Sequence, residues 1–187
     1  MTRLFVAIDL PLEIKQRIVL SPERFAMPQG VKFSPLHNLH LTVLFLGESE
    51  VEKIAPLLKQ IQLPCFNLSI HKRGEFNFSD GHSIQMLKVE GGNPLLELHQ
   101  RTRELCSQMI HLKEEKYQYT PHVTLARSKP EAKAFSQVFV GETFAPEHSL
   151  QQAFNWQAKE FKLFQSIQTN DGPRYEAVEC FPLISLQ

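Results

Sequence analysis

The chain has 187 residues, and its 20 Lys and Arg balance 20 Asp and Glu, so the formal net charge at pH 7 is zero. This length suits one domain, and the apolar fraction of 42% is ordinary for a soluble globular protein. A neutral chain is not expected to coat nucleic acid through a broad basic surface. Zero net charge does not exclude a local basic pocket that binds one phosphate.

The cysteines and the N-terminus favour a cytoplasmic protein. Cys65, Cys106 and Cys180 are far apart and form no C-x-x-C pair, so neither a disulfide framework nor a Cys-based zinc site is expected. The apolar run 4–8 ends at Asp9 and is too short for a signal peptide. Since no apolar stretch approaches the roughly 18 residues of a membrane span, we expect the protein in the cytoplasm.

Alternation of apolar and polar residues predicts a series of short strands. They are expected at residues 4–8, 31–33, 39–46, 66–70, 75–78, 83–90, 122–127, 159–168 and 174–181. The turn residues at 79–81 and 171–172 predict two hairpins. In the strand 39–46, alternation assigns one face to Leu41, Val43 and Phe45, and the opposite face to His40, Thr42, Leu44 and Leu46.

Three segments have helical spacing. Pro11 opens a short helix that carries Ile14 and Ile18, and the loop 21–30 follows it. A capping box of Ser49 and Glu52 predicts the start of a second helix, in which Pro56 indicates a kink or a late start. The third helix begins near 93–94 and has the clearest apolar stripe, formed by Leu95, Leu98, Thr102, Leu105 and Met109.

Short strands interleaved with a few helices predict an α+β fold with mostly antiparallel sheets. No low-complexity tract or linker divides the chain, so we expect a single domain over residues 1–187.

One pattern occurs twice. Residues 40–43 read His-Leu-Thr-Val and residues 122–125 read His-Val-Thr-Leu, so each copy is His–apolar–Thr–apolar. On a strand, residues i and i+2 share a face, so each copy places a histidine beside a threonine and turns its apolar pair into the core. If the two strands lie in related halves, His40, Thr42, His122 and Thr124 converge on one cleft.

Such a set suits phosphodiester chemistry. One imidazole acts as the base on the attacking water and the other as the acid on the departing oxygen, while the threonine hydroxyls donate to the phosphate oxygens. A single His-x-Thr is more often structural, but two copies with apolar opposite faces favour the catalytic interpretation.

A non-catalytic RNA-binding module is the alternative from another class. Residues 73–78 weakly match the aromatic strand motif of RNA-recognition domains. Glu75 and Asn77 depart from that motif, so a hairpin strand with Phe76 and Phe78 in the core is favoured.

The chain also resembles a known family along nearly its whole length. Residues 3–8, 38–42, 45–48, 121–127 and 172–175 are similar to the LigT/ThpR family of RNA 2′,3′-cyclic phosphodiesterases, also called 2′-5′ RNA ligases, within the two-histidine (2H) phosphoesterase superfamily. The resemblance implies a bilobal fold with two pseudo-symmetric, mostly antiparallel sheets around a central cleft and helices outside.

The resemblance also implies an activity. Terminal 2′,3′-cyclic phosphates of RNA would be hydrolysed to 2′-phosphates without metal or other cofactor, with reversible 2′-5′ ligation as a further reaction. By the family pattern His40 is the proton donor, His122 is the proton acceptor, and Thr42 and Thr124 bind the phosphate. The partner is then an RNA or oligonucleotide with a cyclic phosphate end, and the protein is a monomer. A phosphodiesterase of small cyclic phosphates or of 2′-5′ oligonucleotides is the alternative within the superfamily.

Two segments depart from the family pattern, the short loop 21–30 and residues 33–35, which leaves substrate length and base preference open. Arg127 stands where the family often carries a phosphate-binding arginine, but strict alternation turns it away from His122, so this role requires a bulge. His37 lies three residues before His40, yet no nearby Asp, Glu or Cys completes a metal site, and none is expected.

Overall fold

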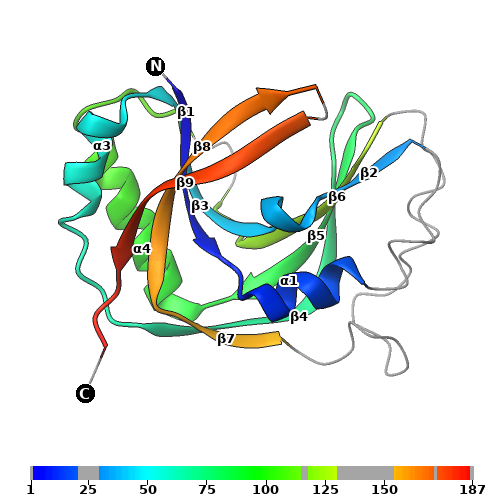
Figure 1. Ribbon diagram of the computed structural model, residues 1–187, viewed down its shortest axis with the longest axis horizontal. Coiled ribbons are helices and arrows are strands. Elements are labelled where there is room, and N and C mark those ends of the chain that lie inside the picture. The colour runs from blue at the N-terminus through cyan, green and yellow to red at the C-terminus, as the bar shows by residue number, and fades with distance from the viewer. Residues whose placement is uncertain (1, 21–29, 115–117, 130–153, 171, 186–187) are drawn as a thin grey trace.

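The computed structural model describes residues 2–20, 30–114, 118–129, 154–170 and 172–185. The strands are β1 (Thr2–Asp9), β2 (Val31–Phe33), β3 (His40–Ser49), β4 (Phe66–Asn77), β5 (Ser83–Glu90), β6 (His122–Ser128), β7 (Phe154–Ala158), β8 (Glu160–Thr169) and β9 (Gly172–Pro182). The helices are α1 (Leu12–Val19), α3 (Val51–Leu58), α4 (Gly92–Cys106) and the 3-10 turn η1 (Leu36–Asn38). The predicted α+β class is confirmed (Figure 1).

The strands form one curled sheet in the order β7-β4-β5-β6-β3-β1-β8-β9, and β2 also pairs with β6. Every ladder between these strands is antiparallel. The β3 and β6 strands share only one residue pair, Leu41 with Val123. The two expected sheets are therefore two halves of one sheet, joined at that pair.

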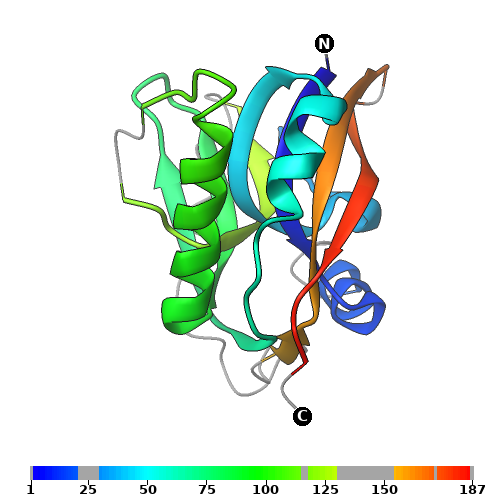
Figure 2. The ribbon, with the colours of Figure 1, turned by 90° about the vertical axis from the view of Figure 1, so that its left-hand side faces the viewer.

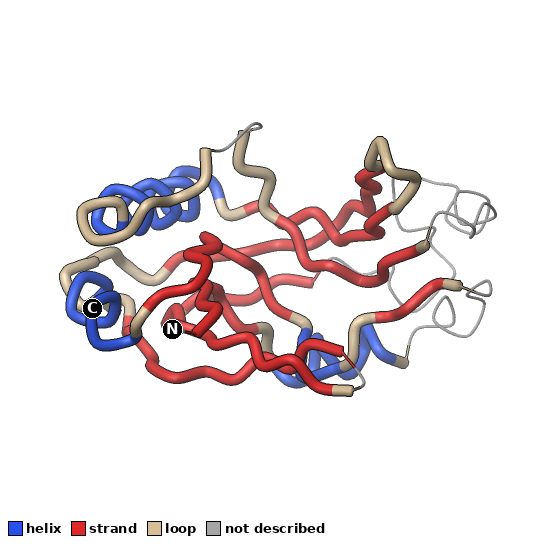
Figure 3. Tube along the Cα trace, turned by 90° about the horizontal axis from the view of Figure 1, so that it is seen from above, coloured by secondary structure: helices blue, strands red, loops and turns tan. Residues whose placement is uncertain are grey.

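One face of the sheet carries the main core. Leu41, Val43, Val123 and Leu125 are each at most 2% exposed, as the alternation of both motifs predicts. The helix α4 packs against β3 and against α3, and contributes Leu95 and Leu98 to the same core. Figures 2 and 3 show α3 and α4 lying side by side on this flank. No helix in the described ranges is long and apolar enough to cross a membrane.

Several boundaries differ from the sequence prediction. The helix α3 starts at Val51 with Glu50 as N-cap and no side-chain cap, so the predicted capping box is wrong; the Ser49 hydroxyl instead donates to the main-chain oxygen of Leu46. Pro56 lies within α3, which does not start late. Met109 follows the end of α4 and is 54% exposed, so it does not continue the stripe.

Two strands were misjudged. A bulge between Ile70 and Lys72 lets β4 continue through a polar stretch, so the two predicted strands are one. The prediction missed β7, although its residues alternate apolar and polar. The predicted loop 21–30 lies outside the described residues, apart from Gly30.

Candidate active site

His40 and Thr42 lie at the start of β3 and point away from the core. Both side chains are half-buried, whereas Leu41 between them is fully buried. The main-chain oxygen of Asn38 lies 2.7 Å from Nδ1 of His40, and the Thr42 hydroxyl lies 3.0 Å from Nε2. Because a carbonyl oxygen only accepts, Nδ1 of the neutral ring carries the proton and Nε2 accepts the hydrogen bond from Thr42.

The second motif repeats this geometry at the start of β6. His122 and Thr124 are half-buried around the buried Val123, and Nδ1 of His122 donates to the main-chain oxygen of Thr120 at 2.8 Å. Each histidine is thus fixed through Nδ1 by the carbonyl two residues before it. Nε2 of each ring is the nitrogen left for chemistry.

The pair Leu41–Val123 brings the two motifs together. On each strand the residues that flank this pair project to the side opposite it, so His40, Thr42, His122 and Thr124 share one side of the sheet around the pair. All four side chains project to the side opposite the core, which we call the histidine face. The two rings also interact electrostatically, because a charge on His122 contributes to lowering the pKa of His40.

A β-bulge follows each motif. In β3, Val43 and Leu44 are both buried because the pairing with β1 shifts by one residue there. In β6, Leu125 and Ala126 are both buried because the pairing with β5 shifts in the same way. Each bulge therefore turns the fifth residue after the histidine onto the histidine face: Phe45 after His40, and Arg127 after His122.

These bulges change which residues of β3 face the core, and they orient Arg127 in β6. The placement of Phe45 with Leu41 and Val43 is wrong, since Phe45 is 68% exposed on the histidine face. The placement of Leu44 and Leu46 on the face of His40 is also wrong, because both side chains are buried in the core. For Arg127 the required bulge is present, and the charge of its exposed guanidinium acts on His122.

Aromatic rings surround His40. The His40 ring lies 4.9 Å from Phe5, 5.1 Å from Tyr175 and 6.0 Å from Phe164, measured between centroids. The exposed ring of Phe45 lies 6.0 Å from Phe5 and extends this group. Next to His122 stands the ring of Phe76, which meets the imidazole edge-on at 5.6 Å. Phe76 and Phe78 are 37% and 50% exposed, so the expectation that they fill the core is wrong.

Burial lowers the pKa of both histidines. The pKa of His40 falls from 6.5 to about 4, mainly because burial disfavours the charged ring; the Asn38 carbonyl and Asp9 oppose this, and Lys15 and His122 add to it. Burial also lowers the pKa of His122, with the Thr120 carbonyl acting against it and Arg127 with it. Both rings are therefore neutral at pH 7 when the site holds no anion.

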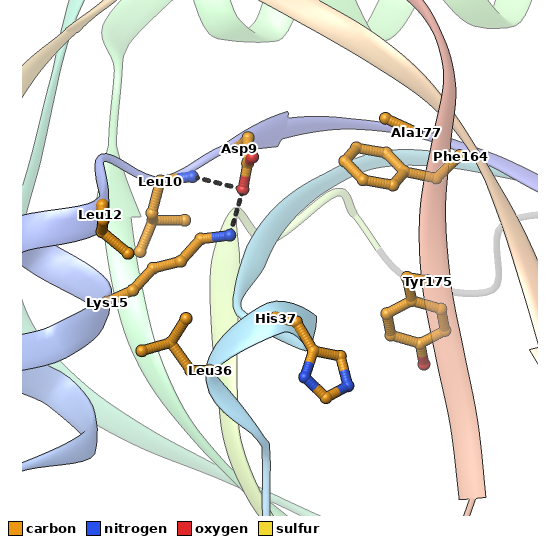
Figure 4. Close-up of a pocket in the computed structure, with 9 residues that line it drawn as sticks. All are labelled: Asp9, Leu10, Leu12, Lys15, Leu36, His37, Phe164, Tyr175 and Ala177. Carbon is orange, nitrogen blue, oxygen red and sulfur yellow. Dashed lines mark hydrogen bonds and ion pairs between the residues drawn. The ribbon is translucent and has the colours of Figure 1, made fainter.

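A pocket of about 430 Å³ lies between β1, α1, η1, β8 and β9. Figure 4 shows the residues that line it. Its lining includes Phe164 and Tyr175, which contact the His40 ring, and Asp9, which pairs with His40 in the β1–β3 ladder. The Asp9 carboxylate binds the buried Lys15 at 2.5 Å and Lys162 at 3.3 Å. His37 is exposed and also lines this pocket. Within the described ranges, no group of three His, Cys, Asp or Glu side chains is arranged to hold a metal ion.

The sequence reasoning missed the residues that support the motifs. His99 of α4 donates from Nδ1 to the main-chain oxygen of Val43 at 2.7 Å, and the Tyr119 hydroxyl donates to that of Thr42 at 2.9 Å. These two rings stack at 4.0 Å. Asp9, Phe5 and Tyr175 were missed too, because their nearness to His40 comes from strand pairing that no local pattern reports.

The fold and the paired motifs define a class of protein. The family model of the 2′-5′ RNA ligase superfamily matches residues 17–169, and the chain belongs to this superfamily. It is 30% identical to the RNA 2′,3′-cyclic phosphodiesterase of Methanocaldococcus jannaschii, with 95% of this chain and 98% of that protein covered. It is 29% identical to the Escherichia coli protein of the same name, with 97% and 96% covered.

Solved structures agree with these relatives. A crystal structure of a phosphoesterase has a TM-score of 0.77 at 26% identity and covers 98% of this chain and 99% of its own. E. coli LigT complexed with 3′-AMP has a TM-score of 0.75 at 25% identity, with 97% and 98% covered.

Proposed function

We propose that this chain is an RNA 2′,3′-cyclic phosphodiesterase that opens a terminal cyclic phosphate to a 2′-phosphate by acid–base catalysis between His40 and His122. The observation that carries the proposal is the Leu41–Val123 pair, because it sets two imidazoles and two threonine hydroxyls on one face. The activity named for the M. jannaschii and E. coli relatives supports the substrate class.

The reaction needs one proton acceptor and one proton donor. Nε2 of His122 takes a proton from water as the water oxygen bonds to phosphorus, and the bond from phosphorus to the 3′-oxygen breaks. Nε2 of His40 gives its proton to that oxygen. The products are a 2′-phosphate and a 3′-hydroxyl, and a proton returns from His122 to His40 through solvent.

The neighbouring charges support this division of roles. The Asp9 carboxylate acts on His40 and favours its protonated form, as an acid requires. Arg127 acts on His122 and favours its neutral form, as a base requires. A bound phosphate adds negative charge beside both rings, so substrate binding raises the pKa of His40 and supplies the protonated acid that the free protein lacks at pH 7.

The hydroxyls and Arg127 act on the phosphate itself. Thr42 and Thr124 donate to non-bridging oxygens, whose charge grows in the transition state. Arg127 adds a charge-assisted donor from the β6 side. Phe45, exposed beside the His40 aromatic group, offers a surface on which the terminal base can stack.

The same steps with a different nucleophile give ligation, and their reversal cleaves the new linkage. When a 5′-hydroxyl takes the place of water, His122 removes its proton and the new bond is a 2′-5′ phosphodiester. The reaction uses no group beyond those already placed.

The test is hydrolysis of an RNA oligonucleotide ending in a 2′,3′-cyclic phosphate, with and without EDTA, followed by mapping of the product phosphate. We expect a 2′-phosphate and no effect of the chelator. His40→Ala and His122→Ala should each lower turnover by about 10²–10⁴. A double-histidine variant that keeps most of the activity, or loss of activity in EDTA, contradicts the proposal.

The pH dependence gives a second readout. The rate should be bell-shaped, and both limbs belong to the coupled pair. Because bound phosphate raises the pKa of the acid, the basic limb of kcat should lie at higher pH than that of kcat/KM, which reports the free protein. Identical limbs for the two parameters would contradict the role assigned to bound phosphate.

A further inference from the structure

The histidine face continues from β6 across β5 to β4, beyond the groups that the hydrolysis uses. Residues that pair directly across antiparallel strands project to the same side of a sheet. Three rows of partners therefore share this face: His122, Lys88 and Lys72; Thr124, Met86 and Gly74; Arg127, Ile84 and Phe76. The extension over β5 and β4 thus carries two lysines and an aromatic ring.

Lys72 and Lys88 are exposed and lie directly opposite each other. Neither forms an ion pair with any residue in the described part of the chain. Like charges opposed across two strands destabilise the pairing. An anion held between the two ammonium groups removes this repulsion, so the pair is suited to a phosphate.

Gly74 determines where Lys88 lies. A Cβ atom at Gly74 would stand 2.7 Å from Cε of Lys88 and 3.2 Å from Cε of Met86. The methylene chain of Lys88 therefore crosses β4 at Gly74, into space that any side chain there would fill. Its ammonium group is carried toward β4, the strand of Lys72, and away from the reacting centre.

Phe76 adds an aromatic surface beside these cations. Its ring meets His122 edge-on and is still 37% exposed, and Phe78 beyond it is 50% exposed. Exposed aromatic rings next to lysines are the combination with which proteins hold single-stranded nucleic acid without reading its sequence.

We propose that the histidine face of β4 and β5 is a subsite for the RNA chain beyond its reactive end, in which Lys72 and Lys88 hold internucleotide phosphate and Phe76 stacks on a base. The inference rests on the proposed function. The backbone of Lys72 lies two strands from His122, about 10 Å at the usual strand spacing, so its charge serves a phosphate other than the reacting one. With no net charge on the chain, such local cations decide the affinity for RNA.

The experiment compares long and short substrates. The kcat/KM is measured for an RNA hexamer with a 2′,3′-cyclic phosphate end and for a mononucleoside 2′,3′-cyclic phosphate. In Lys72→Gln/Lys88→Gln we expect the value for the hexamer to fall about tenfold and that for the mononucleotide to stay unchanged. Lys72→Arg/Lys88→Arg should keep the wild-type ratio. Lys53→Gln/Lys59→Gln, at α3 and its C-cap, is the matched control for the change in charge.

Binding is measured separately from turnover. A fluorescent RNA hexamer ending in a 2′-phosphate is titrated at several salt concentrations. The log–log salt slope should become shallower in Lys72→Gln/Lys88→Gln by about 0.7 for each phosphate that the variant no longer neutralises, and stay unchanged in the α3 control.

The outcomes separate the two proposals. Wild-type protein that hydrolyses both substrates, with ratio and slope unaffected by the lysine changes, overturns the subsite and leaves the function standing. Wild-type protein that binds the hexamer with a slope dependent on these lysines but hydrolyses neither substrate overturns the function and leaves the subsite standing. A slope that the control changes equally reports only the change in overall charge and also overturns the subsite.

Discussion

The hydroxyl of Tyr119 donates a hydrogen bond of 2.9 Å to the main-chain oxygen of Thr42, so the segment that leads into the second motif is fastened to the first. The next residue, Thr120, holds Nδ1 of His122 through its own carbonyl. His99 stacks on Tyr119 and bonds the following carbonyl of β3, that of Val43. Besides the Leu41–Val123 pair, this is a second tie between the motifs.

Tyr119→Phe tests whether this tie positions the histidines. The substitution keeps the ring stacked on His99 and removes only the hydroxyl. We expect kcat to fall about tenfold with little change in KM, because misplacement of the reacting groups costs turnover more than binding. Thr102→Val, which removes a buried hydroxyl bonded to the Leu98 carbonyl in α4, is the control and should lower only the melting temperature. Equal kcat values for Tyr119→Phe and the wild type would show that the hydrogen bond from Tyr119 to Thr42 does not position the histidines.

Arg127→Gln changes the pH profile in a defined direction. The Arg127 charge contributes to lowering the pKa of His122, so its removal raises that pKa. More of the base is then protonated in mild acid, and the limb of the kcat/KM profile that follows the pKa of His122 should move to higher pH. KM should rise at every pH because a phosphate donor is removed. Arg101→Gln, in an exposed ion pair with Glu97 on α4, should change neither. If neither limb moves, the coupling between Arg127 and His122 is contradicted.

The lowered pKa of His40 makes the stability of the fold depend on pH. Folding lowers its pKa from 6.5 to about 4, so between these values the unfolded chain binds a proton that the folded chain does not. The free energy of unfolding should therefore decrease as the pH falls through this window. Urea denaturation of His40→Gln should show a smaller decrease, while His111→Gln, at an exposed position after α4, keeps the wild-type dependence. Parallel curves for His40→Gln and the wild type would refute this origin.

The sequence predicted the motifs well because they obey strict alternation. In each motif the histidine and the threonine are two residues apart on a strand whose other face is buried. Alternation alone therefore places His40 with Thr42 and His122 with Thr124. The predicted alternation failed one residue beyond the first motif, at Leu44, and beyond the second motif it left the side of Arg127 dependent on a bulge. The bulges at Val43 and Leu125 depend on the pairing with β1 and β5, which the local sequence does not contain.

The charged residues that shift the pKa of each histidine could not be predicted from the sequence either. Asp9 and His40 are 31 residues apart in the chain and meet only because β1 and β3 pair in one register. Arg127 is an exception, because strict alternation predicts that it can face His122 only if the strand bulges, and β6 has that bulge. Strand periodicity thus predicts which faces carry chemistry, whereas tertiary pairing decides which charges tune it.

The two threonines should respond differently to the same substitution. In the free protein the Thr42 hydroxyl donates to Nε2 of His40 at 3.0 Å and so stabilises the neutral ring. Thr42→Val and Thr124→Val each delete a donor to the phosphate and should lower kcat about 10-fold to 100-fold. Only Thr42→Val also removes the bond to His40, which raises the pKa of that ring and should move the limb of the pH–rate profile that follows His40 to higher pH. The measurement is the full profile of kcat/KM for both variants, with circular dichroism to confirm folding. A profile that shifts equally in both variants, or in neither, would show that the Thr42 hydroxyl does not control the proton on His40.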